Sequence, residues 1–287
     1  AWNGENWEMV EIEEGDTTAQ HYGLAVDLGS TTVVARLLDC NSGEILKEVS
    51  CFNKQIQWGT DILSRIFYCK DNREKLEEVR RATVESICEC MDKLDASHSA
   101  LSMVIAGNTT MIHFLLGMDA FCVFYTPHAV HADRPGFQLA RDLDIPLKGY
   151  VYCYPAKSNY LGGDIISGMI DTELYKKNEI SVFFDIGTNG ELVIGNKEFL
   201  LCGAGAAGPA LEGGVVRTGM RADIGAVDEV KIRDGNIFVH VIGNSAPQGI
   251  CGSGIIDLIA ELFLEGWIDI RGKLSPEKSP LIQERDN

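Results

Sequence analysis

The sequence predicts an α/β fold of two related domains with mixed sheets, the second of which is incomplete. The main observation is a sequence pattern that occurs twice: an apolar strand that ends in an acidic residue, a tight turn of glycine and hydroxyl residues, and a second apolar strand. Asp27 of the first copy aligns with Asp185, and Gly29 aligns with Gly187. The second observation is the order of elements, because a β-β-β-α-β-α-β-α series begins again in the second half and stops after one large helix.

The first half opens with an acidic, polar segment, residues 1–21, which we interpret as the remnant of a linker. Apolar runs between polar turns then predict strands at 22–28, 32–39, 44–53, 101–106 and 149–154. Apolar residues at helical spacing predict helices at 61–69, 72–94, 111–116 and 165–174. Thr60 is the expected N-cap of the first helix. Residues 117–149, which hold Pro127, Pro135 and Pro146, are predicted to be rich in loops.

The second half repeats the three opening strands at 181–186, 191–195 and 198–202. A hairpin is predicted at 226–233 and 236–242, followed by a helix at 255–266. We therefore expect a first domain at 22–178, a second at 179–270 and a polar tail at 271–287. Because the repeat lacks its last strands and helices, we also expect the chain to be a fragment that binds ATP weakly.

Composition excludes several classes of protein. The net charge of −17 argues against nucleic-acid binding, which usually needs a basic face. No apolar run approaches the roughly 18 residues of a membrane helix, so no membrane contact is expected. Nine scattered Cys without a Cys-x-x-Cys pair indicate reduced thiols in the cytoplasm.

The paired turns are the candidate chemical site. One interpretation is a pair of ordinary hairpin turns, with Asp and Gly as turn formers. Two copies at equivalent positions favour the other interpretation, in which each turn presents backbone N–H groups and side chains to a nucleotide's phosphates. The expected phosphate contacts are Gly29, Ser30, Thr31, Thr32, Gly187, Thr188, Asn189 and Gly190. Asp27 and Asp185 are expected to hold Mg²⁺ or to orient the attacking water, and are the candidate catalytic residues.

Two further motifs lie at predicted helix N-termini, and a helix N-terminus is a favourable site for an anion. Asn108 and Thr109 follow a buried strand, and either could simply be a helix N-cap. Gly252, Ser253 and Gly254 form the second motif, for which we predict a nucleotide contact, with capping by Ser253 as the alternative.

Six stretches together resemble one branch of the superfamily of actin, sugar kinases and heat-shock chaperones, namely the reductive activators of corrinoid proteins. The matching stretches are VDLGSTT at 26–32, GTDILSRI at 59–66, AGNTTM at 106–111, FDIGTNGE at 184–191, AAGPALEG at 206–213 and ICGSGIID at 250–257. The resemblance covers about residues 22–270. It implies duplicated actin/ribonuclease-H-like domains with a βββαβαβα repeat.

The resemblance also implies a function. Such activators use ATP and Mg²⁺ to return an inactive Co(II) corrinoid protein to Co(I) for anaerobic methyl transfer. The electron comes from a [2Fe–2S] cluster on the activator's own N-terminal ferredoxin domain, and a homodimer is common. This chain has no Cys-x4-Cys-x2-Cys, so the cluster is expected only in a full-length protein. The C-terminal Gly-Gly turn that contacts adenosine in the family is also missing after Gly266.

Other functions remain open at this point. A small-molecule kinase of the same superfamily would need a catalytic base, for which Asp185 and Asp164 are the candidates. An activator of a radical acyl-CoA dehydratase would need Cys ligands for a shared cluster, and the scattered Cys fit that poorly. A nucleotide-binding assembly or sensor module needs no catalysis at all. Whether this fragment is itself an enzyme is left open, and we expect it to be inactive alone.

Overall fold

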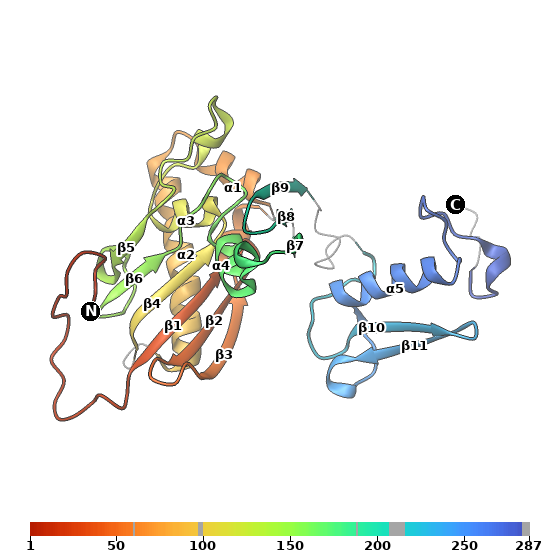
Figure 1. The fold of residues 1–287 in the computed structure, drawn as a ribbon, viewed down its shortest axis with the longest axis horizontal. Coiled ribbons are helices and arrows are strands. Elements are labelled where there is room, and N and C mark those ends of the chain that lie inside the picture. Colours follow the sequence, from red (N-terminus) through yellow and green to blue (C-terminus); the bar gives the residue numbers. More distant parts are fainter. Residues whose placement is uncertain (60, 97–99, 188, 207–215, 283–287) are drawn as a thin grey trace. The chain divides into compact units, whose positions relative to one another are not determined.

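The computed structural model describes residues 1–59, 61–96, 100–187, 189–206 and 216–282 of the chain. They form two compact units. The first unit holds Ala1–Phe183 with Glu191–Gly203, and the second holds Phe184–Gly190 with Ala204–Asn287. Each unit is considered by itself below (Figure 1).

The first unit is built on a six-stranded mixed sheet, which confirms the predicted fold class. Its strands, in spatial order, are β3 (Ile45–Phe52), β2 (Thr32–Asp39), β1 (Tyr22–Leu28), β4 (Ala100–Gly107), β6 (Tyr150–Cys153) and β5 (Gly136–Leu139). The first three form the predicted antiparallel meander, and β4 and β6 continue the sheet in parallel with β1. Parallel neighbours bring the carboxyl ends of β1 and β4 together, with Leu28 beside Gly107.

The main core lies between this sheet and the helices α1 (Ile62–Cys69), α2 (Arg73–Leu94) and α3 (Thr109–Leu115). Alternate residues of β1, Leu24, Val26 and Leu28, point into it and are almost fully buried. Helix α2 packs against β2 and β3. Each such buried apolar side chain contributes roughly 1.5–3 kcal/mol, so this core holds β1 and its terminal turn firmly in place.

Helix α4 (Gly163–Thr172) packs against β4 and lies in front of the sheet in Figure 1, where α2 lies behind it. A smaller core of Ile165, Leu174 and Val193 supports this helix. Because side chains alternate along a strand, Asp27 points to the face opposite the main core. The α4 N-terminus shares that face, since a Cβ added to Gly163 would come within 3.5 Å of the Ala106 Cα, and Ala106 is the neighbour of Asp27 across the sheet.

Two smaller sheets complete the fold. One contains β7 (Ser181–Ile186), β8 (Asn189–Gly195) and β9 (Leu200–Ala206) in that order. The other, in the second unit, contains β11 (Asn236–Val241), β10 (Ala226–Arg233) and β12 (Gly249–Ile250), with α5 (Gly252–Leu264) packed on β10. The predicted hairpin at 226–242 is therefore confirmed.

Several predicted boundaries differ from the structure. Helix α3 begins at Thr109, two residues before the predicted start, because Asn108 is its N-cap. The side chain of Asp61 caps α1, whereas Thr60 lies outside the described residues. Strand β5, within the predicted loop region 117–149, was not foreseen: it is an edge strand paired on one side with β6. Helix α5 begins three residues earlier than predicted.

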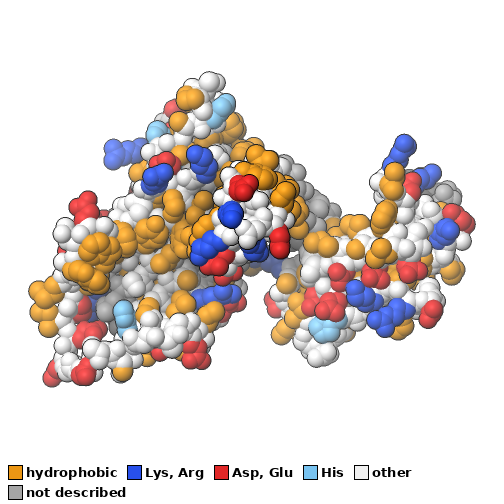
Figure 2. Space-filling model, in the orientation of Figure 1, with side chains coloured by type: hydrophobic (Ala, Val, Ile, Leu, Met, Phe, Trp, Pro, Cys, Tyr) orange, Lys and Arg blue, Asp and Glu red, His pale blue; other side chains and the backbone are white. Residues whose placement is uncertain are grey.

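The face shown in Figure 2 carries acidic and basic side chains mixed together, with the basic ones scattered singly or in small groups. That face therefore does not carry the basic stripe of nucleic-acid-binding proteins. Among the helices that the structure describes, none is long and apolar enough to cross a membrane.

Candidate functional site

The first turn, residues 29–31, connects β1 to β2 at the carboxyl end of β1. Asp27 lies two residues before it and is exposed. Gly29 is required by the turn itself, because a Cβ there would stand 2.4 Å from the carbonyl oxygen of Thr32. The sequence interpretation assigned this glycine to the close approach of phosphate. The structure adds a reason within the protein, since no side chain fits at this position.

All three carbonyl groups of the first turn accept hydrogen bonds from the protein. The Asn53 amide Nδ2 donates to the Gly29 oxygen at 2.9 Å, and the Asn53 backbone N–H donates to the Thr31 oxygen at 2.9 Å. The Arg65 Nη1 donates to the Ser30 oxygen at 2.6 Å. In a trans peptide the C=O and N–H point in opposite directions. Each of these peptide units therefore points its N–H group away from its Asn53 or Arg65 donor, an orientation that suits a phosphate-binding turn.

The structure brings the second polar motif to this turn. A Cβ on Gly107 would stand 2.7 Å from the Leu28 oxygen, so the end of β4 lies directly against the end of β1. The Asn108 side chain accepts from the N–H of Met111 at 3.0 Å, which is the capping role weighed as the alternative. Thr109 is buried, and its hydroxyl donates to the Ser158 oxygen. Both residues border the first turn, and a contact with ligand remains a prediction.

The N-terminus of α4 meets the same place. A Cβ on Gly162 would stand 2.4 Å from both the Asn108 Cα and the Gly107 oxygen. The helix can therefore start here only because this residue has no side chain. As a result, three features converge at one edge of the sheet: the first turn (residues 29–31), the start of α3 and the start of α4. Asp164 lies in the opening helical turn of α4.

The second turn, in the second unit, differs from the first in its surroundings. Its backbone is tight, since the Gly187 N–H donates to the Asn189 oxygen at 2.9 Å. Among the described residues, a Cβ on Gly187 would meet only the Asn189 oxygen, at an ordinary 3.8 Å, so the described part of the fold leaves space there. Asp185 is half-buried, and this burial raises the pKa of its carboxyl. Thr188 lies outside the described residues, and Gly190 follows on β8.

The α5 start, the third predicted contact, is placed by packing against β10. A Cβ on Gly254 would stand 2.3 Å from the Val227 oxygen, which explains this glycine. The capping role considered for Ser253 is wrong, because the cap position is Cys251 and no side chain caps the helix. Ser253 is exposed and its hydroxyl lies 3.2 Å from the buried Cys251 thiol. Gly252 and Ser253 thus stand at a helix end with N–H groups that need partners.

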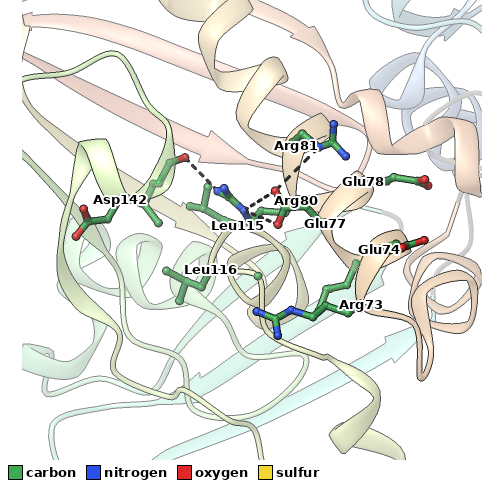
Figure 3. A pocket seen from close by; sticks show the side chains of 12 residues that line it. Arg73, Glu74, Glu77, Glu78, Arg80, Arg81, Leu115, Leu116 and Asp142 are labelled. Carbon is green, nitrogen blue, oxygen red and sulfur yellow. Dashed lines mark hydrogen bonds and ion pairs between the residues drawn. The ribbon is translucent and has the colours of Figure 1, made fainter.

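Other hollows and clusters do not compete with these turns. A groove of about 960 Å³ lies along α2 and the end of α3, where Arg80 binds Glu77 (Figure 3). The Arg80 guanidinium also binds Asp144. Among the described residues, no group of three or more His, Cys, Asp or Glu could hold a metal ion. Residues 207–215, which include most of the AAGPALEG stretch at 206–213, lie outside the described residues.

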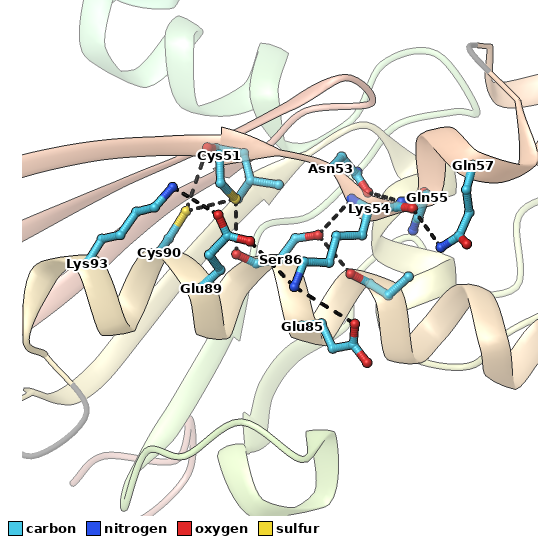
Figure 4. Close-up of polar contacts among 12 residues, drawn as sticks. Cys51, Asn53, Lys54, Gln55, Gln57, Glu85, Ser86, Glu89, Cys90 and Lys93 are labelled. Atoms are coloured by element: carbon cyan, nitrogen blue, oxygen red, sulfur yellow. Dashed lines mark hydrogen bonds and ion pairs between the residues drawn. The ribbon is translucent and has the colours of Figure 1, made fainter.

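Sequence reasoning missed three buried polar features. Asn53 and Arg65 are the donors to the first turn, and both are fully buried. Cys51 and Cys90 form a thiol pair 3.3 Å apart between β3 and α2, in which the hydrogen bond from Cys90 lowers the pKa of Cys51 (Figure 4). The sequence signal that could have pointed to Arg65 was its place in the motif at 59–66, within a predicted helix.

Comparison with known proteins covers nearly the whole chain. A family model described as the RACo middle region matches residues 22–177, and one described as the C-terminal domain of RACo, the ASKHA domain, matches residues 179–287. A solved structure of a reductive activator for corrinoid,iron-sulfur protein has a TM-score of 0.85 and 39% identity, covering 95% of this chain and 45% of that one.

Two curated proteins are also similar. The corrinoid activation enzyme RamQ of Eubacterium limosum is 36% identical over 258 residues, which are 88% of this chain and 43% of RamQ. A [Co(II) methylated amine-specific corrinoid protein] reductase of Methanosarcina barkeri is 24% identical over 222 residues, 73% of this chain and 41% of that protein. The chain therefore spans less than half the length of these relatives.

Proposed function

This chain belongs to the RACo family of reductive activators of corrinoid proteins, and we propose that it supplies the ATP-binding part of such an activator. In this proposal each of the two turns binds nucleotide phosphate. The ASKHA domain implies nucleotide binding, and the assignment of individual residues is ours. The domain division at 178 and 179 is part of the same proposal.

One observation carries the assignment of phosphate to the turns. The three carbonyl groups of the first turn accept hydrogen bonds from Asn53 and Arg65, so each of these peptide units points its N–H group away from its donor. The second turn leaves room beside Gly187 that no described side chain fills. Ser30, Thr31, Thr32 and Asn189 are the further donors that we assign to phosphate oxygens, together with Thr188 and the backbone of Gly190.

The residues present also fit Mg²⁺ as the nucleotide's counterion. Hard cations prefer oxygen ligands, and a strand in each unit ends near an acid, Asp27 or Asp185. When bound, the ion would neutralise part of the phosphate charge. The half-buried carboxyl of Asp185 would gain a compensating positive charge, which favours its ionised form. We propose that the two acids bind the ion or the attacking water, as the catalytic residues.

The similar proteins suggest the reaction and the partner. Their names describe corrinoid activation and reduction of a Co(II) corrinoid protein. We propose that the full-length protein transfers one electron to Co(II), giving Co(I), with ATP binding or hydrolysis driving the step. No group of three or more His, Cys, Asp or Glu in the described part of the chain could hold a metal ion, and we propose that a ferredoxin domain of the same protein supplies the electron. A cytoplasmic homodimer completes the proposal.

The test follows cobalt directly. The full-length protein, a Co(II) corrinoid protein and a low-potential reductant are mixed with or without MgATP, and the visible spectrum is recorded. We expect Co(I) to accumulate only with MgATP, and Asp27→Asn and Asp185→Asn to lower its rate strongly. Reduction at the same rate without nucleotide would contradict the proposal. Consumption of ATP with a sugar or small acid, with cobalt unchanged, would instead favour the kinase alternative.

A further inference from the structure

Two residues outside the paired turns, Asn53 and Arg65, donate hydrogen bonds to the carbonyl groups of the first turn. Asn53 directly follows strand β3 and caps the short 3-10 helix Lys54–Trp58, and Arg65 lies in α1. Both are fully buried, although Asn and Arg are usually exposed. Between them they supply every hydrogen bond described above to the carbonyl groups of residues 29–31.

Asn53 is fixed in one orientation by its own contacts. Its Oδ1 accepts from the Gln55 N–H at 3.0 Å, which leaves Nδ2 to donate to the Gly29 oxygen at 2.9 Å. The Gln55 side chain in turn donates to the Thr83 hydroxyl on α2. The amide that contacts the turn is therefore anchored through buried partners to the main core, so it cannot rotate without breaking other bonds.

Arg65 uses its guanidinium in the same way. Its Nε donates to the Gly59 oxygen at 2.9 Å, and Nη1 donates to the Ser30 oxygen and, at 3.1 Å, to the Gln55 side chain. Burial lowers the pKa of Arg65 to about 10, so the group stays charged at neutral pH. Its hydrogen-bond acceptors are neutral, and its Nη2 has no hydrogen-bond partner in the described part of the chain. The charge of the Asp61 carboxylate offsets part of the cost of burial without a hydrogen bond to the guanidinium that the structure describes.

A buried cation without a bound carboxylate is costly, because burial disfavours the charged form. An anion on the far side of a thin turn lowers that cost, since the Coulomb interaction is stronger in the interior than in water. The hydrogen bonds from Arg65 and Asn53 to the turn carbonyls also fix the direction of the N–H groups in the same peptide units. The charge of Arg65 and the orientation of the N–H groups would both favour phosphate at the first turn, although Asn53 and Arg65 would not contact the phosphate directly.

We propose that Asn53 and Arg65 are positioning residues of the first turn: they orient its N–H groups, and Arg65 adds positive charge behind them for nucleotide phosphate. The inference rests on the proposed function, because it needs phosphate at this turn. It assigns to the motif at 59–66 a role that the sequence alone did not reveal.

The test compares isosteric and control variants in the full-length protein. Asn53→Asp keeps the acceptor for Gln55 and loses the donor to Gly29. Ser86→Ala is the control, because the buried Ser86 hydroxyl accepts from the Lys54 N–H at 2.9 Å at the same junction and has no described contact with the turn (Figure 4). Affinity for MgATP is measured by calorimetry, and stability by thermal unfolding.

We expect Asn53→Asp to weaken MgATP binding by about tenfold or more, the usual scale for a lost oriented hydrogen bond. Ser86→Ala should lower the unfolding temperature and leave affinity within about twofold. Arg65→Met should weaken binding more than Arg65→Lys, which keeps the charge and can retain one of the carbonyl bonds. Partial rescue by Lys is a result that a purely structural role would not produce.

The outcomes separate the two levels of the proposal. If the wild-type protein does not bind MgATP, the proposed function fails. If it binds and the Asn53 and Arg65 variants bind equally well, the turns keep their function and the positioning role is refuted. The positioning role is also refuted if Ser86→Ala loses as much affinity as Asn53→Asp at a similar loss of stability. Should Asn53→Asp fail to fold, the Arg65 pair decides the question.

Discussion

The two aligned glycines should respond to alanine in opposite ways. At Gly29 the added Cβ would stand 2.4 Å from the backbone oxygen of Thr32, about 1 Å inside an ordinary contact of 3.4 Å. At Gly187 the nearest atom in the described part of the chain would be 3.8 Å away, which is an ordinary contact, and the backbone there is not left-handed. The first glycine is therefore needed by the fold. The second is needed only if something else occupies the space beside it.

These distances set the expected magnitudes. Forcing an extra methyl into a packed site typically costs about 1–3 kcal/mol, so Gly29→Ala should destabilise the protein by that amount. For a domain of roughly 150–250 residues, each kcal/mol lowers the unfolding temperature by about 2–4 °C. Gly187→Ala should instead be neutral or stabilising by up to about 1 kcal/mol, because alanine reduces the entropy of the unfolded chain.

The assay measures stability and nucleotide affinity for both variants. Thermal unfolding without nucleotide should show Gly29→Ala below wild type and Gly187→Ala at or above it. Calorimetric titration of the full-length protein with MgATP should show that Gly187→Ala has lost at least about tenfold in affinity, or about 1.4 kcal/mol, because the methyl group takes the space of a phosphate oxygen. A stabilised variant that binds more weakly separates function from folding.

One result would refute this reasoning. If Gly187→Ala folds as expected and binds MgATP as tightly as the wild-type protein, phosphate does not approach Gly187, and the second turn is an ordinary hairpin turn. If Gly29→Ala unfolds at the wild-type temperature, the steric requirement for glycine in the first turn is refuted.

Three further predictions concern single contacts. Burial raises the pKa of Asp185, so the folded state holds its proton more tightly than the unfolded state, and stability falls as the pH rises from the ordinary Asp value of 3.8 through the raised pKa. Asp185→Asn should therefore raise the unfolding temperature at neutral pH without nucleotide and flatten its pH dependence. Asn72→Ala should cost about 1 kcal/mol, since the Asn72 side chain caps α2 by accepting from the Lys75 N–H at 3.0 Å, and urea unfolding should show this with MgATP affinity unchanged. Gly254→Ala should cost about 1–3 kcal/mol in thermal unfolding, because its Cβ would stand 2.3 Å from the Val227 oxygen.

The alternating strands were the most predictable part of the molecule. β1, β2, β7 and β10 begin and end at the predicted residues. The first three are mainly apolar runs closed by polar turns, and β10 alternates apolar with charged residues before a polar turn. Helix α2 was predicted within one residue at its start, since Asn72 is a strong cap and its apolar residues recur at helical spacing. Strand β5 was not predictable, because its four half-buried residues gain their order from pairing with β6, which lies later in the chain.

Helix starts were less predictable where glycine precedes them. The residues Gly252–Gly254 are poor helix formers, so the sequence favoured a later start for α5. Packing overrides that preference, because only glycine lets the helix lie against the Val227 carbonyl. Gly162 has the same role at α4, against Asn108. In both cases the local sequence signals a loop, and the contact that makes the helix possible is distant in sequence.

The supports of the candidate site could not be derived from local pattern either. An Arg in an amphipathic helix is normally expected on the solvent side, and Arg65 is fully buried because three neutral acceptors from separate segments converge on it. The repeated sequence pattern suggests two equivalent turns. In the structure Asp27 is exposed and Asp185 is half-buried, and Gly29 is sterically required whereas Gly187 has room. Because the surroundings differ, the two copies should contribute differently to phosphate and Mg²⁺, with the first turn fixed by the fold and the second left to adapt to the ligand.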